Sequence, residues 1–366
     1  MKKPIRYREL TFNHNINNKF KKIFNDFLLS GQYLPGKKIL QFEKKISNYC
    51  GRKFCIGVSS GSNALYLALK SQNLGRGDEI ICPAISWLAT ANAISMTGAT
   101  PVFVDVNIDQ NVSPNEIKKA INKKTKAIMM VHFKGIIADY DSIKKIAKSN
   151  SLLLIEDAAQ AFGAKLNNNF AGNLGDISSF SFNPMKVLQG FGESGAVLTN
   201  SNNTFLRIKK MRHLGVDIKN REISKYIELN SKIDEIQAAL IIENLKNLNE
   251  EVKLRKKIIK NYISELKKIV IDCNYDLKSS SGYDYQILVK NRNKLKDFLY
   301  AKKIETKIKH PILMADQPTF KKAKKFSLKN ARWICKHSLS LPLHRNLSQT
   351  NQEYIIDSIK KFYKYS

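Results

Sequence analysis

The sequence predicts an α/β fold in which helices cover a mainly parallel sheet. In the first half of the chain, short apolar runs alternate with segments of helical periodicity. Each run is apolar at successive positions, as is typical of parallel strands that are buried on both faces. The chain has 366 residues, 43% of them hydrophobic, which is enough for one large and one smaller domain.

The expected elements of the first half follow from these patterns. Apolar residues at helical spacing predict helices over residues 63–69, 89–96 and 140–149. Short apolar runs predict strands at 79–82, 101–104, 126–131 and 152–155. No Gly-x-Gly-x-x-Gly fingerprint follows an early strand, which argues against a dinucleotide-binding dehydrogenase.

The pattern changes near residue 234, where a long helix begins. Helical periodicity covers residues 234–248 and continues, with heavy charge, over 250–266. The remainder predicts a strand at 285–289, a helix at 293–302 and a terminal helix at 351–362. We therefore expect a large domain over residues 1–245, which includes the N-terminal segment, and a smaller C-terminal α+β domain over 246–366.

The charge of the chain is strongly positive, with 62 Lys and Arg against 31 Asp and Glu and a net charge of +31. Most of this charge is lysine spread along the whole length, and no helix-turn-helix, zinc-finger or RNA-binding signature is present. We therefore expect no nucleic-acid partner. A positive field would still favour a substrate that carries a diphosphate.

Apolar runs and cysteines indicate the compartment. No run approaches the roughly twenty residues that span a membrane, and no apolar signal segment follows the basic N-terminus. The five cysteines are scattered, without a C-x-x-C pair or a metal-like spacing. We expect free thiols, no metal site, no membrane association and a cytoplasmic location.

One lysine stands in an unusual context. Lys186 follows Ser181 by five positions and precedes a glycine-rich run at 190–195, and upstream the apolar run 152–155 leads into Glu156-Asp157. A lysine on such a turn and a carboxylate at a strand end suit pyridoxal phosphate. That cofactor needs a lysine for covalent attachment and a carboxylate to keep its pyridine nitrogen protonated. Without these surroundings, a solvated surface charge would be the simpler reading of Lys186.

Two further motifs fit the same cofactor. The segment Ser59-Ser60-Gly61-Ser62-Asn63 precedes a helix, so free backbone amides there can bind a phosphate. An ordinary serine N-cap would give the same pattern. Trp87 follows the end of a strand, where it could stack on the cofactor ring, although a lone tryptophan is more often a core residue.

Together these motifs resemble the DegT/DnrJ/EryC1/StrS family of pyridoxal-phosphate-dependent nucleotide-sugar aminotransferases. The resemblance runs in one order over most of the chain, through further motifs at 31–36, 58–65, 77–83, 98–105, 236–239 and 340–343. It implies a pyridoxal-phosphate-dependent transferase of fold type I, with a mainly parallel seven-stranded sheet and a smaller C-terminal α+β domain.

The resemblance also implies roles for single residues. Lys186 is the expected catalytic residue, which holds the cofactor and then moves a proton as general base and acid. Asp157 is the expected partner of the pyridine nitrogen, and Trp87 the residue that stacks on the ring. The other implied cofactor contacts are Ser62, Asn63, Gln160, Ser181 and Asn230.

Two implied substrate contacts are Lys232, where the family usually has arginine, and His310. Asn230 and Lys232 lie in a stretch that in the family reaches the neighbouring subunit's site. The resemblance therefore implies a homodimer with shared active sites.

Three positions depart from the family pattern. Ser194 replaces a glycine, and Lys134 stands in a motif that usually contains tyrosine. Asp284 takes the place of a common histidine. The last two leave the identity of the substrate and the stereochemistry open.

The function that this resemblance implies is transfer of an amino group, from glutamate, to a keto group of a nucleotide-linked sugar, in surface-polysaccharide or amino-sugar biosynthesis. A pyridoxal-phosphate-dependent sugar dehydratase is an alternative, but in that branch histidine replaces the lysine, so Lys186 argues against it. A non-catalytic nucleotide-sugar-binding regulator is a second alternative. The presence of Lys186, Asp157 and Trp87 together argues against lost chemistry. The sugar and its nucleotide stay open.

Overall fold

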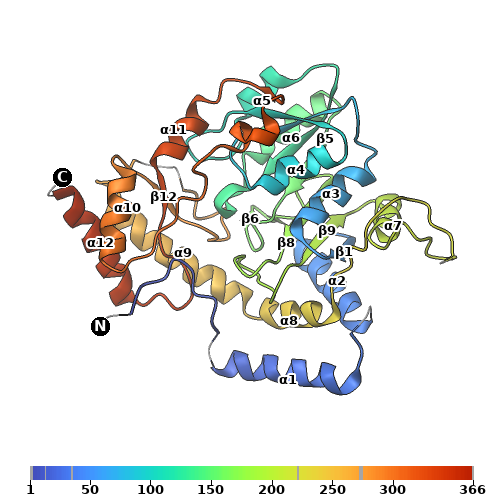
Figure 1. Cartoon of the computed structure of the whole chain (residues 1–366), viewed down its shortest axis with the longest axis horizontal. Coiled ribbons are helices and arrows are strands. Elements are labelled where there is room, and N and C mark those ends of the chain that lie inside the picture. Colours follow the sequence, from blue (N-terminus) through green and yellow to red (C-terminus); the bar gives the residue numbers. More distant parts are fainter. Residues whose placement is uncertain (1–2, 13, 34–35, 221, 272–274, 365–366) are drawn as a thin grey trace.

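An eight-stranded sheet forms the centre of the molecule, with helices on both faces (Figure 1). The structure is a computed structural model that describes residues 3–12, 14–33, 36–220, 222–271 and 275–364. Leu34 and Pro35 of the first family motif, and Cys273, lie outside the described residues.

The strand order across the sheet is β1-β9-β8-β5-β4-β2-β3-β11. Strand β9 is antiparallel to β1 and β8, and all other neighbours are parallel. The mainly parallel sheet is therefore as predicted. The strands are β1 (Phe54–Val58), β2 (Glu79–Pro83), β3 (Thr100–Val104), β4 (Thr125–Val131), β5 (Leu153–Asp157), β8 (Ile177–Ser181), β9 (Gly195–Thr199) and β11 (Lys324–Lys325).

The first seven of these strands lie between residues 54 and 199, in the part of the chain where the seven-stranded sheet was expected. The eighth, β11, comes from the C-terminal part and pairs with β3 at the edge of the sheet. It consists of Lys324 and Lys325, which are both exposed, so no apolar pattern in the sequence predicts this strand.

The alternation of side chains along the strands builds one core on each face of the sheet. In β4, Met129 and Val131 belong to one apolar cluster, whereas Ile128 and Met130 belong to the other. Helices α3 and α4 pack in the first cluster, and α2, α6 and α8 in the second. Both faces of the central strands are thus buried, which is why their sequences are continuously apolar.

The helices confirm the predictions for 63–69, 89–96 and 140–149, which lie within α3, α4 and α6. The helical stretch after residue 234 is divided at Lys246 and Asn247 into α8 and α9. The helices are α1 (His14–Ser30), α2 (Lys37–Cys50), α3 (Gly61–Ser71), α4 (Leu88–Met96), α5 (Pro114–Ala120), α6 (Tyr140–Ser149), α7 (Asn202–Met211), α8 (Glu235–Leu245), α9 (Leu248–Leu266), α10 (Arg292–Ala301), α11 (Lys329–His337) and α12 (Gln349–Lys364).

A third apolar cluster lies in the C-terminal part, between α9, α10, α12 and the small sheet of β10 (Gln286–Leu288) and β12 (Ser338–Ser340). The N-terminal Ile5 packs in this cluster and pairs with Ile304. Residues 5–8 thus lie against the C-terminal part, on the same side of the molecule as the C-terminus (Figure 1). The domain boundary after residue 245 stays a prediction.

In the described part of the chain, no helix is both long and apolar enough to cross a bilayer. The remaining short elements are the hairpin of β6 (Lys165–Leu166) and β7 (Asn169–Phe170) and the 3₁₀ turns η1 (Phe133–Gly135), η2 (Met314–Asp316) and η3 (Pro318–Phe320).

Candidate active site

A cleft of about 800 Å³ opens at the ends of the parallel strands and has two walls. The sheet wall consists of residues 60–62, Trp87, Asp157, Gln160, Ser181 and Lys186, and the C-terminal wall of Tyr7, Arg8, Tyr283 and residues 307–311. Because parallel strands end at one edge of the sheet, side chains far apart in sequence converge there.

The start of α3 provides a cluster of hydrogen-bond donors. Ser60 caps the helix, since its Oγ accepts from the Asn63 amide at 3.1 Å. The backbone amides of Gly61 and Ser62 have no recorded partner among the described residues. A Cβ on Gly61 would lie 2.5 Å from Cβ of Ser181, so only glycine lets the Ser181 hydroxyl approach this turn. Free amides at a helix N-terminus beside two or more hydroxyls fit a phosphate group.

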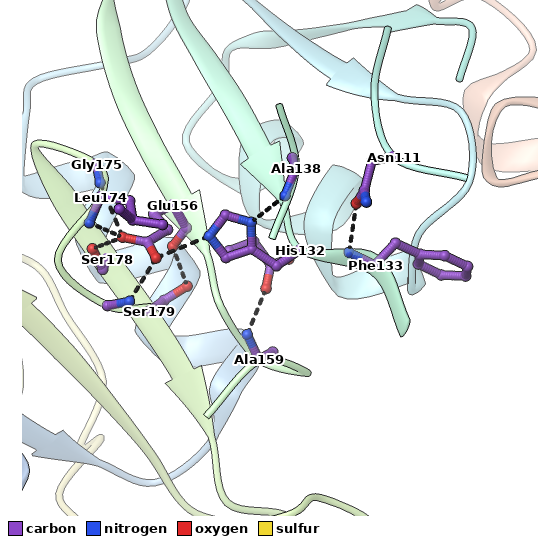
Figure 2. A network of polar contacts seen from close by, with 12 residues as sticks. Asn111, His132, Phe133, Ala138, Glu156, Ala159, Leu174, Gly175, Ser178 and Ser179 are labelled. Carbon is purple, nitrogen blue, oxygen red and sulfur yellow. Dashed lines mark hydrogen bonds and ion pairs between the residues drawn. The ribbon is translucent and has the colours of Figure 1, made fainter. Parts of the chain in front are cut away.

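Two neighbouring carboxylates on β5 face opposite sides of the sheet. Glu156 is fully buried and accepts hydrogen bonds from His132 Nε2, from Ser178 Oγ and from backbone amides of residues 172, 174 and 175 (Figure 2). Burial by itself would raise the pKa of Glu156, but its contacts with His132, Ser178 and Gly172 lower it to about 2. His132 Nδ1 accepts from the Ala138 amide, so Nε2 carries the proton that is donated to Glu156.

Asp157 faces the cleft and accepts fewer hydrogen bonds than Glu156. Its Oδ2 accepts from Thr90 Oγ1 at 2.9 Å and its Oδ1 from the Ala159 amide at 3.2 Å. Burial raises the pKa of Asp157, and hydrogen bonds from Thr90 and Ala159 and the charge of Lys186 only partly oppose this. No ion pair of Asp157 is recorded in the described chain. A buried carboxylate without a cation, open to a cleft, fits a ligand with a protonated ring nitrogen.

Lys186 belongs to the sheet wall and approaches Tyr283 of the C-terminal wall. Its Nζ is 5.1 Å from the ring centroid of Tyr283. Trp87 has 64% of its surface exposed and lines the cleft, with its ring centroid 6.4 Å from that of His310. So exposed a tryptophan is a surface on which a planar ring can stack.

The C-terminal wall is built on Asp284. This fully buried carboxylate accepts hydrogen bonds from Tyr7 Oη at 2.9 Å, Gln286 Nε2 at 3.0 Å and Ser340 Oγ at 2.9 Å. It also forms ion pairs with Lys309 Nζ at 3.1 Å and Arg8 Nη2 at 3.4 Å. Burial alone would raise the pKa of Asp284, but Lys309 and Arg8 lower it to about 2. Two cations thus compensate this buried aspartate.

Seven of the predicted site residues line the cleft: Ser62, Trp87, Asp157, Gln160, Ser181, Lys186 and His310. The Asn63 side chain lies elsewhere, because its amide donates to Ser59 Oγ and Ser231 Oγ.

Asn230 and Lys232 are also absent from the lining of this chain's own cleft. They form backbone bridges with His213 and Val58. The roles of all these residues stay predictions.

Sequence reasoning missed several residues of the cleft. Thr90, which donates a hydrogen bond to Asp157, lies in the first turn of α4 and could have been suspected from its place after Trp87. Arg8 and Lys309 had no signal, since each is one basic residue among many and they meet Asp284 only in the folded chain. Among the described residues, no group of three or more His, Cys, Asp or Glu could hold a metal ion.

The chain is similar to known proteins over most of its length. The model of the DegT/DnrJ/EryC1/StrS aminotransferase family matches residues 14–360. Over 353 residues, the chain is 34% identical to the dTDP-3-amino-3,6-dideoxy-alpha-D-galactopyranose transaminase of Aneurinibacillus thermoaerophilus, covering 96% of this chain and 97% of the relative.

Two further proteins are similar over most of the chain. The pleiotropic regulatory protein of Geobacillus stearothermophilus is 33% identical, with 94% of each chain covered. The crystal structure of NtdA from Bacillus subtilis with bound cofactor PMP superposes with a TM-score of 0.90 at 26% identity, covering 96% of this chain and 83% of that chain.

Proposed function

The chain belongs to the DegT/DnrJ/EryC1/StrS aminotransferase family, and we propose that Lys186 and Asp157 are the centre of its active site. It is a pyridoxal-phosphate-dependent aminotransferase that acts on nucleotide-linked sugars. One observation carries the assignment of the site. Asp157 is a buried carboxylate without a cationic partner in the described chain, and it faces the same cleft as Lys186.

The residues of the sheet wall suit each part of the cofactor. When bound, pyridoxal phosphate supplies a carbonyl for amino exchange and a ring that accepts electrons. The amides of Gly61 and Ser62, with the hydroxyl of Ser181, would hold its phosphate. Asp157 would hold the ring nitrogen in its protonated form, and Trp87 would cover the ring. Gln160 borders the same space and is fixed by the Lys134 amide, which donates to its Oε1 at 2.9 Å.

Lys186 has two tasks in this proposal. Its amine would hold the cofactor covalently, and its free Nζ would act as the base that takes a proton from the donor's α-carbon. Glutamate is the proposed donor. His310 is neutral at pH 7, because burial and then Lys309 lower its pKa to about 4. It can therefore contact the substrate without adding charge.

We further propose a homodimer in which each cleft takes residues from both subunits. Asn230 is exposed, and neither it nor Lys232 reaches this chain's own cleft, which leaves them available to a second copy. Exposed apolar side chains on the same segment, Ile227 and Leu229, support a surface that is covered in an assembly. A cytoplasmic location also stays part of the proposal, supported by free, buried thiols at Cys50, Cys55, Cys82 and Cys335.

The two alternatives are weaker. A dehydratase of this fold would have histidine at the position of Lys186. A regulator is favoured by the name of one relative, but this chain keeps Lys186, Asp157 and Trp87 around one cleft.

The test is incubation of the purified protein with glutamate and a panel of keto-sugar nucleotides. Mass spectrometry should detect an aminated sugar, together with 2-oxoglutarate in equal amount. A regulator would yield neither product, and a dehydratase would yield a deoxygenated sugar that carries no added amino group.

A further inference from the structure

The C-terminal wall of the cleft carries more positive than negative charge. Arg8 and Lys309 both contact Asp284, and no second carboxylate in the described chain pairs with either cation. Asp284 is fully buried behind these residues and does not line the cleft, whereas Arg8 and Lys309 do. Among the three charges of Arg8, Lys309 and Asp284, one positive charge is therefore uncompensated.

Lys309 has N–H donors without a recorded acceptor in the described chain. An ammonium group has three N–H donors, and the single recorded acceptor for Lys309 among the described residues is Asp284 Oδ2, at 3.1 Å. Its Nζ also lies 4.4 Å from the ring centroid of Tyr283. The ion pair and the ring fix the ammonium in place, with 17% of the side chain exposed and the group at the edge of the cleft.

Tyr283 reports the electrostatic potential at this place. It is buried, which alone would raise the pKa of its phenol, yet Lys186, Lys309 and Arg8 lower that pKa to about 8. An anion is thus favoured at the Tyr283 ring, where Lys186 and Lys309 both lie within about 5 Å of the centroid.

We propose that Lys309, held by Asp284, binds a carboxylate of the substrate in the cleft that Lys186 also lines. The proposal rests on the proposed function and adds a specificity-determining residue to it. The carboxylate has two sources, the amino donor's α-carboxylate and a carboxylate on the sugar ring. Both are planar anions that accept a charged hydrogen bond from an ammonium.

Matched ligand pairs on the cofactor-loaded protein distinguish the two sources. For the donor, calorimetry compares 2-oxoglutarate with levulinate, which lacks the α-carboxylate. For the sugar, it compares UDP-glucuronate with UDP-glucose, which differ in a carboxylate at one carbon. The wild type should prefer the carboxylate ligand in at least one pair. Lys309→Met should reduce that preference by about tenfold or more, and Lys309→Arg should restore part of it.

Two further variants separate this role from a structural one. Lys307→Met removes an exposed charge from the same wall and should change the preference by less than about threefold. Lys309→Gln is a second variant without the charge, and its amide can still form hydrogen bonds beside Asp284. Asp284 keeps Arg8 as its ion-pair partner in both Lys309→Met and Lys309→Gln, so no buried charge is left unpaired, and both variants should lose the preference.

The outcomes are distinct. A lost preference for 2-oxoglutarate alone assigns the site to the donor, and a lost preference for UDP-glucuronate alone assigns it to the sugar. The proposal is wrong if the ratio of the two affinities within each ligand pair is the same in the wild type and in every folded Lys309 variant. It is also wrong if the wild type has no preference for the carboxylate ligand in either pair. If the wild type transfers amino groups but the ratios do not change, the carboxylate site fails and the proposed function stands. If the wild type transfers none, the proposed function itself fails.

Discussion

The two walls of the cleft differ in how they balance their buried charges. On the sheet wall, Asp157 has a hydroxyl and an amide as partners but no cation among the described residues. On the C-terminal wall, Asp284 has three neutral donors and two cations, and a positive charge remains. One wall therefore suits a cationic ring nitrogen and the other an anionic group. A cleft of this kind can hold a zwitterionic cofactor and orient a charged substrate against it.

The two walls are also joined by one residue. The Lys134 amide donates to Gln160 Oε1 on the sheet wall, and its carbonyl accepts from the Asp284 amide at 3.4 Å. Ser281 Oγ donates to the Gln160 carbonyl beside Gly135, where a Cβ would lie 2.2 Å from that hydroxyl. Gly135 has φ of +81°, so glycine is needed there both for its conformation and for the close approach.

The largest expected effect is on Lys186, the residue of the sheet wall that approaches Tyr283 of the C-terminal wall. Lys186→Ala should abolish amino transfer, because it removes both the attachment point of the cofactor and the base. The fold should persist, since Lys186 has no recorded ion pair in the described chain. Turnover assays together with circular dichroism check this. Measurable amino transfer by the variant would contradict the role of Lys186.

The next effect tests the unpaired carboxylate of the sheet wall. Asp157→Asn should keep the cofactor but lose orders of magnitude in rate, since an amide does not hold the ring nitrogen in its protonated form. Near-normal turnover in this variant would refute the role given to Asp157.

Glu156→Gln is the matched control, one residue away on the opposite face of β5. It should affect mainly stability, by about 2–4 kcal/mol, because it disturbs a buried charged network. The pKa of Glu156 is lowered to about 2, so its contribution is present above the ordinary pKa of 4.5 and is lost as the pH falls toward 2. The wild type should therefore lose more unfolding free energy than Glu156→Gln over that interval.

A smaller effect tests whether a second copy completes the cleft. Lys186→Ala and Asn230→Ala/Lys232→Ala should each be inactive alone. After subunit exchange, half of the dimers are mixed and each has one intact site, so activity should return to about a quarter of the wild type. If tagged chains show that the subunits have exchanged and no activity returns, the active sites are not shared.

The smallest effect concerns Lys134, whose backbone joins the walls. Its side chain is fully buried, and its Nζ has no hydrogen-bond partner among the described residues. Lys134→Met should therefore raise the free energy of unfolding by about 1 kcal/mol while activity persists. The exposed Lys123→Met is the control, with a change within about 0.5 kcal/mol. A strongly destabilised Lys134→Met would show that the ammonium itself supports the junction.

The sheet wall could be predicted from sequence because its signals are local. Asp157 ends an apolar strand, Ser60 and Ser62 begin a helix, and each motif spans only a few residues. Strand β11 could not be predicted, since two exposed lysines carry no apolar pattern and pair with β3 only through the tertiary fold.

The sequence indicated His310 and Asp284 on the C-terminal wall but not the cations beside Asp284, for a related reason. Arg8, Asp284 and Lys309 come from three distant segments, and among 62 basic residues none has a distinguishing neighbour in sequence. The side-chain direction of Asn63 was equally beyond prediction, because its partner Ser231 is 168 residues away.

The most direct test of the account is to locate the bound cofactor. The purified protein, loaded with pyridoxal phosphate, should be yellow and should bleach on treatment with borohydride, which fixes the cofactor to its lysine. Peptide mass spectrometry should then find the reduced adduct on Lys186, which lines the cleft. An adduct on another lysine, or none after reconstitution with the cofactor, would contradict the assignment of this cleft as the active site.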